Sequence, residues 1–84
     1  MTWFVYLLEC SDGSYYAGIT NRLDHRINAH NSGQGARYTR SRGPVKLLAI
    51  QEHPDRSTAS KAEAQLKRLA RSQKLAFFQA NDER

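Results

Sequence analysis

Cysteine and long apolar runs are scarce in this chain, and each shortage excludes a class of protein. Cys10 is the single cysteine among 84 residues, so no intramolecular disulfide can form and a four-ligand Cys/His zinc site lacks its thiolates. No stretch approaches the roughly 20 apolar residues of a membrane span, and the first apolar run is too short for a signal peptide. We therefore expect a cytoplasmic protein with no membrane partner.

Acidic side chains are also few, with 8 Asp and Glu against 13 Lys and Arg and a net charge of +5. Two segments of the sequence are rich in basic residues, and each contains one acidic residue, Asp24 in the first and Glu63 in the second. The first basic segment contains Arg22, Arg26, Arg37, Arg40 and Arg42. Nucleic acid is the commonest polyanion for such a domain, although charge runs also form solvated faces. A chain of this length makes one domain with a thin core.

Two apolar runs at residues 3–8 and 15–19 predict a β-hairpin around Ser11-Asp12-Gly13. A three-residue loop ending in a left-handed glycine pairs residue 10 with residue 14. Leu8 then opposes Tyr16, and Tyr6 opposes Gly18. Because side chains alternate faces, this register places both tyrosines on one face and leaves open space at Gly18.

The segment 22–31 predicts a helix capped by Thr20 or Asn21, with Gly33 just beyond its end. Leu23 and Ile27 form its buried side. Arg26 and His30, four residues apart, share a neighbouring stripe that can face a groove beside the sheet. Residues 33–44 are predicted to form a functional loop.

A third strand is predicted over residues 45–51. A helix capped by Ser57 or Thr58 should then run to about residue 71, with Glu63 beside its apolar stripe. A short last helix capped by Ser72 should cover the sheet before a polar tail from about residue 80. The sequence contains no repeat, linker or low-complexity tract.

These residues can support phosphodiester hydrolysis. The guanidinium of Arg26 suits a phosphate, and Glu63 could hold Mg²⁺, which accepts one protein carboxylate and keeps its waters. Tyr6, Tyr16 and His30 are alternative proton acceptors, and the sequence does not choose between them.

Each residue also has a structural interpretation. Tyr6 and Tyr16 could be core aromatics, Arg26 a solvated charge, His30 a helix-end residue, and Glu63 an ion-pair partner of Lys67. Tyr38 could stack on a base or anchor its loop. Asn81 could cap, bind phosphate or belong to a disordered tail.

The motifs Phe4-Val5-Tyr6 and Tyr16-Ala17-Gly18 are relaxed forms of the two signature triplets of GIY-YIG nuclease domains. The resemblance continues through Arg26, residues 30–33 and 35–39, and the segment 63–74, so that it covers nearly the whole chain. The closest resemblance is to the small single-domain bacterial proteins of the predicted-endonuclease, YhbQ-like family. It implies one domain over residues 1–84, an α/β fold with a three-stranded antiparallel sheet flanked by helices (β-β-α-β-α-α), and metal-dependent DNA cleavage.

By resemblance, the catalytic positions are Tyr6, Tyr16, Arg26, His30 and Tyr38, and Glu63 is the ligand of Mg²⁺ or Mn²⁺. Gly18, Arg22, Arg37, Arg40 and Arg42 are the candidate substrate-binding residues. Larger relatives carry added DNA-binding domains and use a late asparagine, which Asn81 does not match in context.

The resulting prediction is an endonuclease of low sequence specificity that acts on DNA, in the cytoplasm or at the nucleoid. Branched, damaged or single-stranded DNA, as met in DNA repair, or a protein partner could direct it. The alternative is a module that binds DNA or RNA and cleaves weakly or not at all, and salt-sensitive binding without a metal-dependent product would identify it.

Overall fold

The computed structural model describes residues 2–82, with side chains as far as Gln79. Three antiparallel strands form one sheet in the order β2-β1-β3. The strands are β1 (Trp3–Glu9), β2 (Tyr15–Thr20) and β3 (Lys46–His53), and the helices are α1 (Leu23–Asn31), α2 (Arg37–Arg40), α3 (Arg56–Lys67) and α4 (Arg71–Asp82). The predicted small antiparallel sheet flanked by helices is confirmed, with α2 as an additional short turn of helix.

The β1–β2 hairpin has the predicted register. Tyr6 pairs with Gly18 and Leu8 with Tyr16. The turn closes through a hydrogen bond of 2.8 Å from the Cys10 amide to the Ser14 carbonyl. Gly13 has a φ of 84°, in the left-handed region where glycine carries no steric penalty. One glycine therefore sets which side chains of β1 and β2 share a face.

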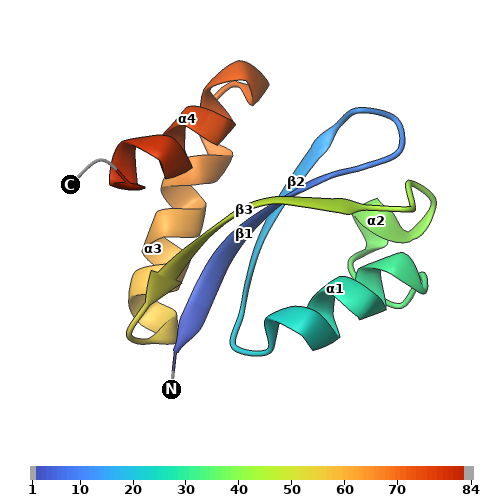
Figure 1. Cartoon of the computed structure of the whole chain (residues 1–84), viewed down its shortest axis with the longest axis horizontal. Helices are drawn as coiled ribbons and strands as arrows, with labels where there is room; N and C mark the ends of the chain where they lie inside the picture. The colour runs from blue at the N-terminus through green and yellow to red at the C-terminus, as the bar shows by residue number, and fades with distance from the viewer. Residues whose placement is uncertain (1, 83–84) are drawn as a thin grey trace.

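Helices cover both faces of the sheet, and Figure 1 shows α3 and α4 on one side and α1 with α2 on the other. The α3/α4 cluster is apolar and consists of Val5, Leu7, Ala17, Ala59, Ala62, Leu66 and Phe78. The α1 cluster consists of Tyr6, Leu8, Cys10 and Val45, with Leu23 and Ile27 packed against it. Alternation along β1 thus sends an aliphatic row to one core and a tyrosine to the other. Within residues 2–82, no helix is long and apolar enough to cross a membrane.

The start of α1 differs from the prediction, because Arg22 and not Thr20 or Asn21 occupies the N-cap position. The Thr20 hydroxyl instead accepts a hydrogen bond of 3.0 Å from the Arg22 amide. This hydrogen bond closes the turn between β2 and α1. The end of α1 is as predicted, since Gly33 follows it with a φ of 82°.

The loop predicted over residues 33–44 contains the helical turn α2. The Thr39 side chain is buried and its hydroxyl donates to the Ala36 carbonyl at 3.0 Å. A single turn gives no hydrophobic period in the sequence, which is why the prediction missed it.

Both C-terminal helices begin earlier than predicted, and α3 ends at Lys67 instead of about residue 71. Asp55 caps α3 by accepting a hydrogen bond of 2.9 Å from the Thr58 amide. A carboxylate at this position also interacts favourably with the helix dipole, which explains its advantage over Ser57 or Thr58. Ser72, the predicted cap of the last helix, is the second residue of α4, and α4 continues through Asp82 into the segment predicted to be a tail.

Candidate active site

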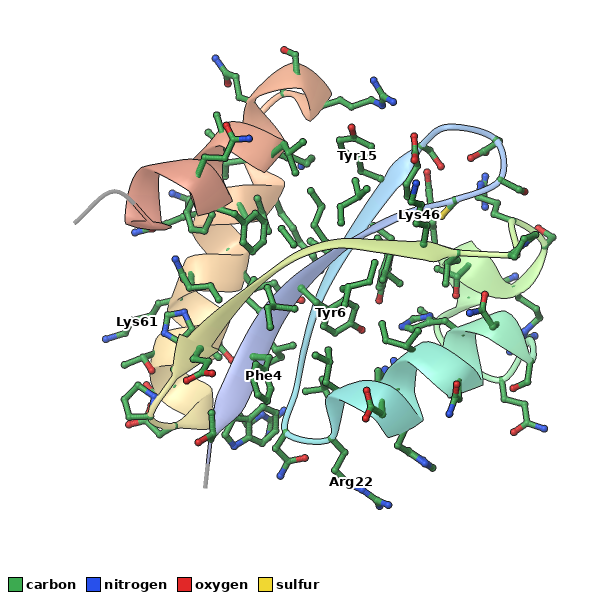
Figure 2. All side chains as sticks on the ribbon, in the orientation of Figure 1. Phe4, Tyr6, Tyr15, Arg22, Lys46 and Lys61 are labelled. Carbon is green, nitrogen blue, oxygen red and sulfur yellow. The ribbon has the colours of Figure 1, made fainter. Side chains whose placement is uncertain are left out.

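Tyr6 lies at the centre of β1 and is 1% exposed. Its side chain points from β1 toward α1 (Figure 2). Gly18 does not leave the open space that the sequence predicted, because the Tyr6 phenol fills it. A Cβ at position 18 would meet the Tyr6 hydroxyl and lie 2.6 Å from its Cζ. The glycine therefore allows the phenol to lie across β2, an edge strand of the sheet.

His30 lies in the last turn of α1 and is 1% exposed. Its Nε2 is 3.0 Å from the Tyr6 hydroxyl, and its Nδ1 is 2.7 Å from the Thr39 hydroxyl. The chain after α1 passes close by at Gly35, where a Cβ would lie 2.8 Å from the His30 Cα. Both ring nitrogens have partners, so the imidazole is fixed in position as well as buried.

Arg26 lies one turn before His30 on α1, and its guanidinium acts on both buried groups. Burial raises the pKa of the Tyr6 phenol, and the hydrogen bond and charge of Arg26 oppose this rise. Burial, followed by the positive charge of Arg26, lowers the pKa of His30 to about 4. At neutral pH the pair is therefore a neutral phenol beside a neutral imidazole.

Tyr16 and Tyr38 extend the site as a stack of rings. The Tyr16 centroid is 5.3 Å from that of His30, and Tyr38 stacks on Tyr16 at 5.9 Å. The guanidinium of Arg42 lies 4.1 Å from the Tyr38 centroid, donates to the Tyr38 carbonyl at 2.8 Å and pairs with Asp12 at 3.1 Å. These contacts favour the interpretation of Tyr38 as a loop anchor. They also engage Arg42, one of the predicted substrate-binding residues, within the protein.

Glu63 lies on α3, which packs against β2, and its side chain is 23% exposed. The negative charge of Glu63 makes the smallest of the contributions that raise the pKa of the Tyr6 phenol. The alternative role as a partner of Lys67 is also present, as an ion pair of 3.3 Å. Since Lys67 is about half exposed, this pair is weak and can be exchanged.

The donors near Glu63 fit one kind of metal ion. In the part of the chain that the structure describes, no group of three or more His, Cys, Asp or Glu side chains could hold a metal. Zinc requires such a group, whereas Mg²⁺ is bound by one or two carboxylates together with water and substrate phosphate oxygens. A single half-buried carboxylate such as that of Glu63 is therefore a ligand of the kind that Mg²⁺ or Mn²⁺ accepts.

The other predicted substrate-binding arginines, Arg22, Arg37 and Arg40, are exposed. In Figure 2, Arg22 points away from the sheet at the start of α1. A groove of about 400 Å³ adjoins Arg26 along the outer side of α1. It is lined by His25, Arg26, Asn28, Ala29, Ser32 and Gln34.

Sequence reasoning missed Thr39 and Gly35 as parts of the site. Both lie in a segment predicted to be loop, where nothing in the residue pattern separates a buried threonine from an exposed one. The available signal was the resemblance to GIY-YIG domains, which covers residues 35–39 but gave neither Thr39 nor Gly35 a role. The side chain of Asn81 lies outside the described residues.

Comparison with known proteins shows which proteins this chain is similar to. The model of the GIY-YIG catalytic domain matches residues 2–76. A UPF0213 protein of Xanthomonas axonopodis pv. citri is 59% identical over 78 residues, covering 93% of this chain and 76% of that protein.

Two solution NMR structures are also similar. A protein from E. faecalis is 38% identical, with a TM-score of 0.70 over 100% of this chain and 90% of that one. A UPF0213 protein from Bacillus halodurans is 47% identical, with a TM-score of 0.56 over 88% of this chain and 79% of that one.

Proposed function

The chain belongs to the GIY-YIG family, and from this premise we propose that it is a divalent-metal-dependent endonuclease that hydrolyses phosphodiester bonds in DNA. The family points to nuclease activity. The metal, the DNA substrate and the roles of individual residues are our inferences from the site.

One observation carries the proposal: a buried tyrosine–histidine hydrogen bond of 3.0 Å beside an arginine. A core that needed only apolar packing would gain nothing from this arrangement, because buried polar groups cost free energy unless they are fully paired. The raised pKa of Tyr6 means that its phenol is protonated before substrate binds. Tyr6 can accept a proton from water only if its own proton leaves at the same time. His30 is the adjacent group that can exchange that proton.

Arg26 is the residue that we assign to the substrate phosphate. Its planar donors match two phosphate oxygens, and its neighbour Tyr6 would then lie beside the attacked phosphorus. Glu63 would hold the Mg²⁺ or Mn²⁺ ion. When bound, such an ion polarises the phosphate and stabilises the leaving oxygen.

The substrate class follows from the charge around this site. Arg22, Arg37 and Arg40 are exposed on the elements that carry Arg26 and Tyr38, and side chains of this type contact phosphates without reading bases. We therefore propose low sequence specificity and, in the cell, action on cytoplasmic DNA.

Supercoiled plasmid nicking by purified protein, with Mg²⁺ or with chelator, tests the proposal. Glu63→Gln and Arg26→Ala should each lower the rate about 10²–10³-fold while the proteins stay folded, since each removes stabilisation of charge in the transition state. Glu52→Gln and Arg68→Ala are matched controls, because both residues are exposed, and these variants should retain activity.

Two results would contradict this function. One is unchanged nicking by both site variants. The other is salt-sensitive DNA binding by the wild type with no metal-dependent product, which would identify a binding module.

A further inference from the structure

Thr39 connects the imidazole of His30 to the backbone of the following loop. Its side chain is 0% exposed. The hydroxyl donates to the Ala36 carbonyl at 3.0 Å and lies 2.7 Å from His30 Nδ1. A hydroxyl has one proton, and a carbonyl can only accept. Because the Thr39 hydroxyl donates to the Ala36 carbonyl, its oxygen is left to accept a hydrogen bond from an N–H at His30 Nδ1.

The hydrogen bond between Tyr6 and His30 then has only one possible direction. His30 is neutral at neutral pH, and a neutral imidazole carries one N–H. With that proton on Nδ1, Nε2 holds a lone pair, so the Tyr6 hydroxyl at 3.0 Å must donate to it. The donors run in sequence from Tyr6 to His30, from His30 to Thr39, and from Thr39 to the Ala36 carbonyl.

We propose that Thr39 is a positioning residue that holds His30 in the tautomer able to receive a proton from Tyr6. The inference rests on the proposed nuclease function, because it gives the proton transfer its direction. In the opposite tautomer Nε2 would carry the proton and donate to Tyr6, and the phenol could not release its own proton to the imidazole.

The step that this arrangement permits is balanced in bonds and protons. The water oxygen bonds to phosphorus as the bond to the leaving oxygen breaks. The water proton moves to the Tyr6 oxygen while the original phenolic proton moves to His30 Nε2. The imidazolium retains its Nδ1 proton, which is hydrogen-bonded to Thr39. Water protonates the leaving oxygen, and the hydroxide formed there is neutralised when Nε2 releases its extra proton to solvent. Tyr6 ends the step as it began, as a neutral phenol.

Gly35 supports the same role by a separate contact. A Cβ at position 35 would lie 2.5 Å from His30 Nδ1. Real Cβ atoms do not approach other atoms so closely, so only glycine lets the loop carrying Thr39 close over the imidazole. The segment 35–39 therefore sets both the position and the tautomer of His30.

The tautomer can be measured without any assay of cleavage. The ¹⁵N shifts of the His30 imidazole, recorded in full-length protein at pH 7, should show Nδ1 protonated and Nε2 unprotonated. Thr39→Ser keeps the hydroxyl and should keep this pattern. Thr39→Val removes the acceptor while preserving shape, and it should shift the proton toward Nε2. Thr58→Val is the control, since it deletes a threonine hydroxyl bonded to Asp55 on α3.

Nicking rates complete the test. Thr39→Val should lower kcat about 10²-fold with little change in KM, the effect expected when proton transfer in the transition state is lost. Thr39→Ser should restore most of the rate. A wild-type imidazole protonated on Nε2, or a Thr39→Val protein with unchanged tautomer and kcat, would overturn the inference. If Thr39→Val does not fold, the wild-type and Thr39→Ser spectra still decide the tautomer. A wild-type protein that never cleaves would overturn the nuclease proposal and leave the tautomer as measured.

Discussion

The two faces of the sheet are built from the same strand and differ in chemistry. Val5 and Leu7 of β1 enter the α3/α4 cluster, whose buried members are all apolar. Tyr6, between them, enters the α1 cluster, where His30 and Thr39 add a buried polar network. Among the described residues no buried side-chain nitrogen or oxygen lacks a partner. The difference indicates that one face supplies stability and the other supplies the site.

Glu63 is the exception that joins the two faces. It lies on α3, at the side of the stripe that packs on the sheet, and its charge reaches Tyr6 of the opposite face. The proposed function requires Glu63 to act past β2, which is an edge strand of the sheet.

The largest effect on stability is expected for a substitution in the apolar layer, the α3/α4 cluster. Leu66 is 0% exposed in the α3/α4 cluster, and Leu66→Ala should lower the free energy of unfolding by about 2–5 kcal/mol through lost burial and a cavity. Urea denaturation measures this loss. Nicking at a temperature where the variant is folded should stay near the wild-type rate, and a tenfold drop there would show that the two faces are coupled.

The dependence of unfolding free energy on acid pH should test the polar face of the sheet, through His30. The pKa of His30 is lowered to about 4 from an ordinary value of 6.5, so between these pH values the unfolded chain binds a proton that the folded chain does not. Unfolding free energy should therefore fall as pH decreases from about 6.5 to 4, by roughly 3 kcal/mol at 1.36 kcal/mol per pKa unit. Above pH 6.5 this contribution is complete and constant.

In the His30→Gln variant, the unfolding free energy should no longer show this part of the pH dependence. Urea denaturation between pH 4 and 7.5 measures it. His25→Gln, at an exposed position on the same helix, should keep it. Parallel pH profiles for the wild type and His30→Gln would contradict a neutral buried imidazole.

The smallest effect is expected at the rim of the site. Arg42→Ala removes the partly exposed ion pair with Asp12 and the contact with Tyr38. Such pairs contribute about 0.2–1 kcal/mol, and the loss should shrink in high salt. Nicking should fall less than tenfold, because Arg42 anchors Tyr38 and does not reach the reacting groups. A hundredfold loss would instead support the direct role on substrate that the sequence suggested.

Much of this architecture is predictable because it depends on local rules. Gly13 fixed the register of the hairpin, and with it the shared face of Tyr6 and Tyr16. The four-residue spacing of Leu23 and Ile27, and of Arg26 and His30, placed two stripes on α1 correctly. These features follow from the periods of strands and helices, which a sequence displays directly.

The remaining features depend on contacts between distant segments. The Tyr6 ring fills the space at Gly18 because the phenol turns toward His30. The pairing register of the two strands does not reveal this orientation. Thr39 joins the site through a single helical turn in a loop without periodicity. In each case the deciding contact is tertiary, which local preference cannot anticipate.

The proposed nuclease function requires that groups from both layers act on one phosphate at the β2 edge. A crystal structure with Mn²⁺ and a short cleavage-resistant DNA tests it most directly. We expect metal density at the Glu63 carboxylate, the Arg26 guanidinium on the same phosphate, and a water within hydrogen-bond distance of the Tyr6 hydroxyl. Metal bound away from Glu63, with the phosphate distant from Arg26, would contradict it.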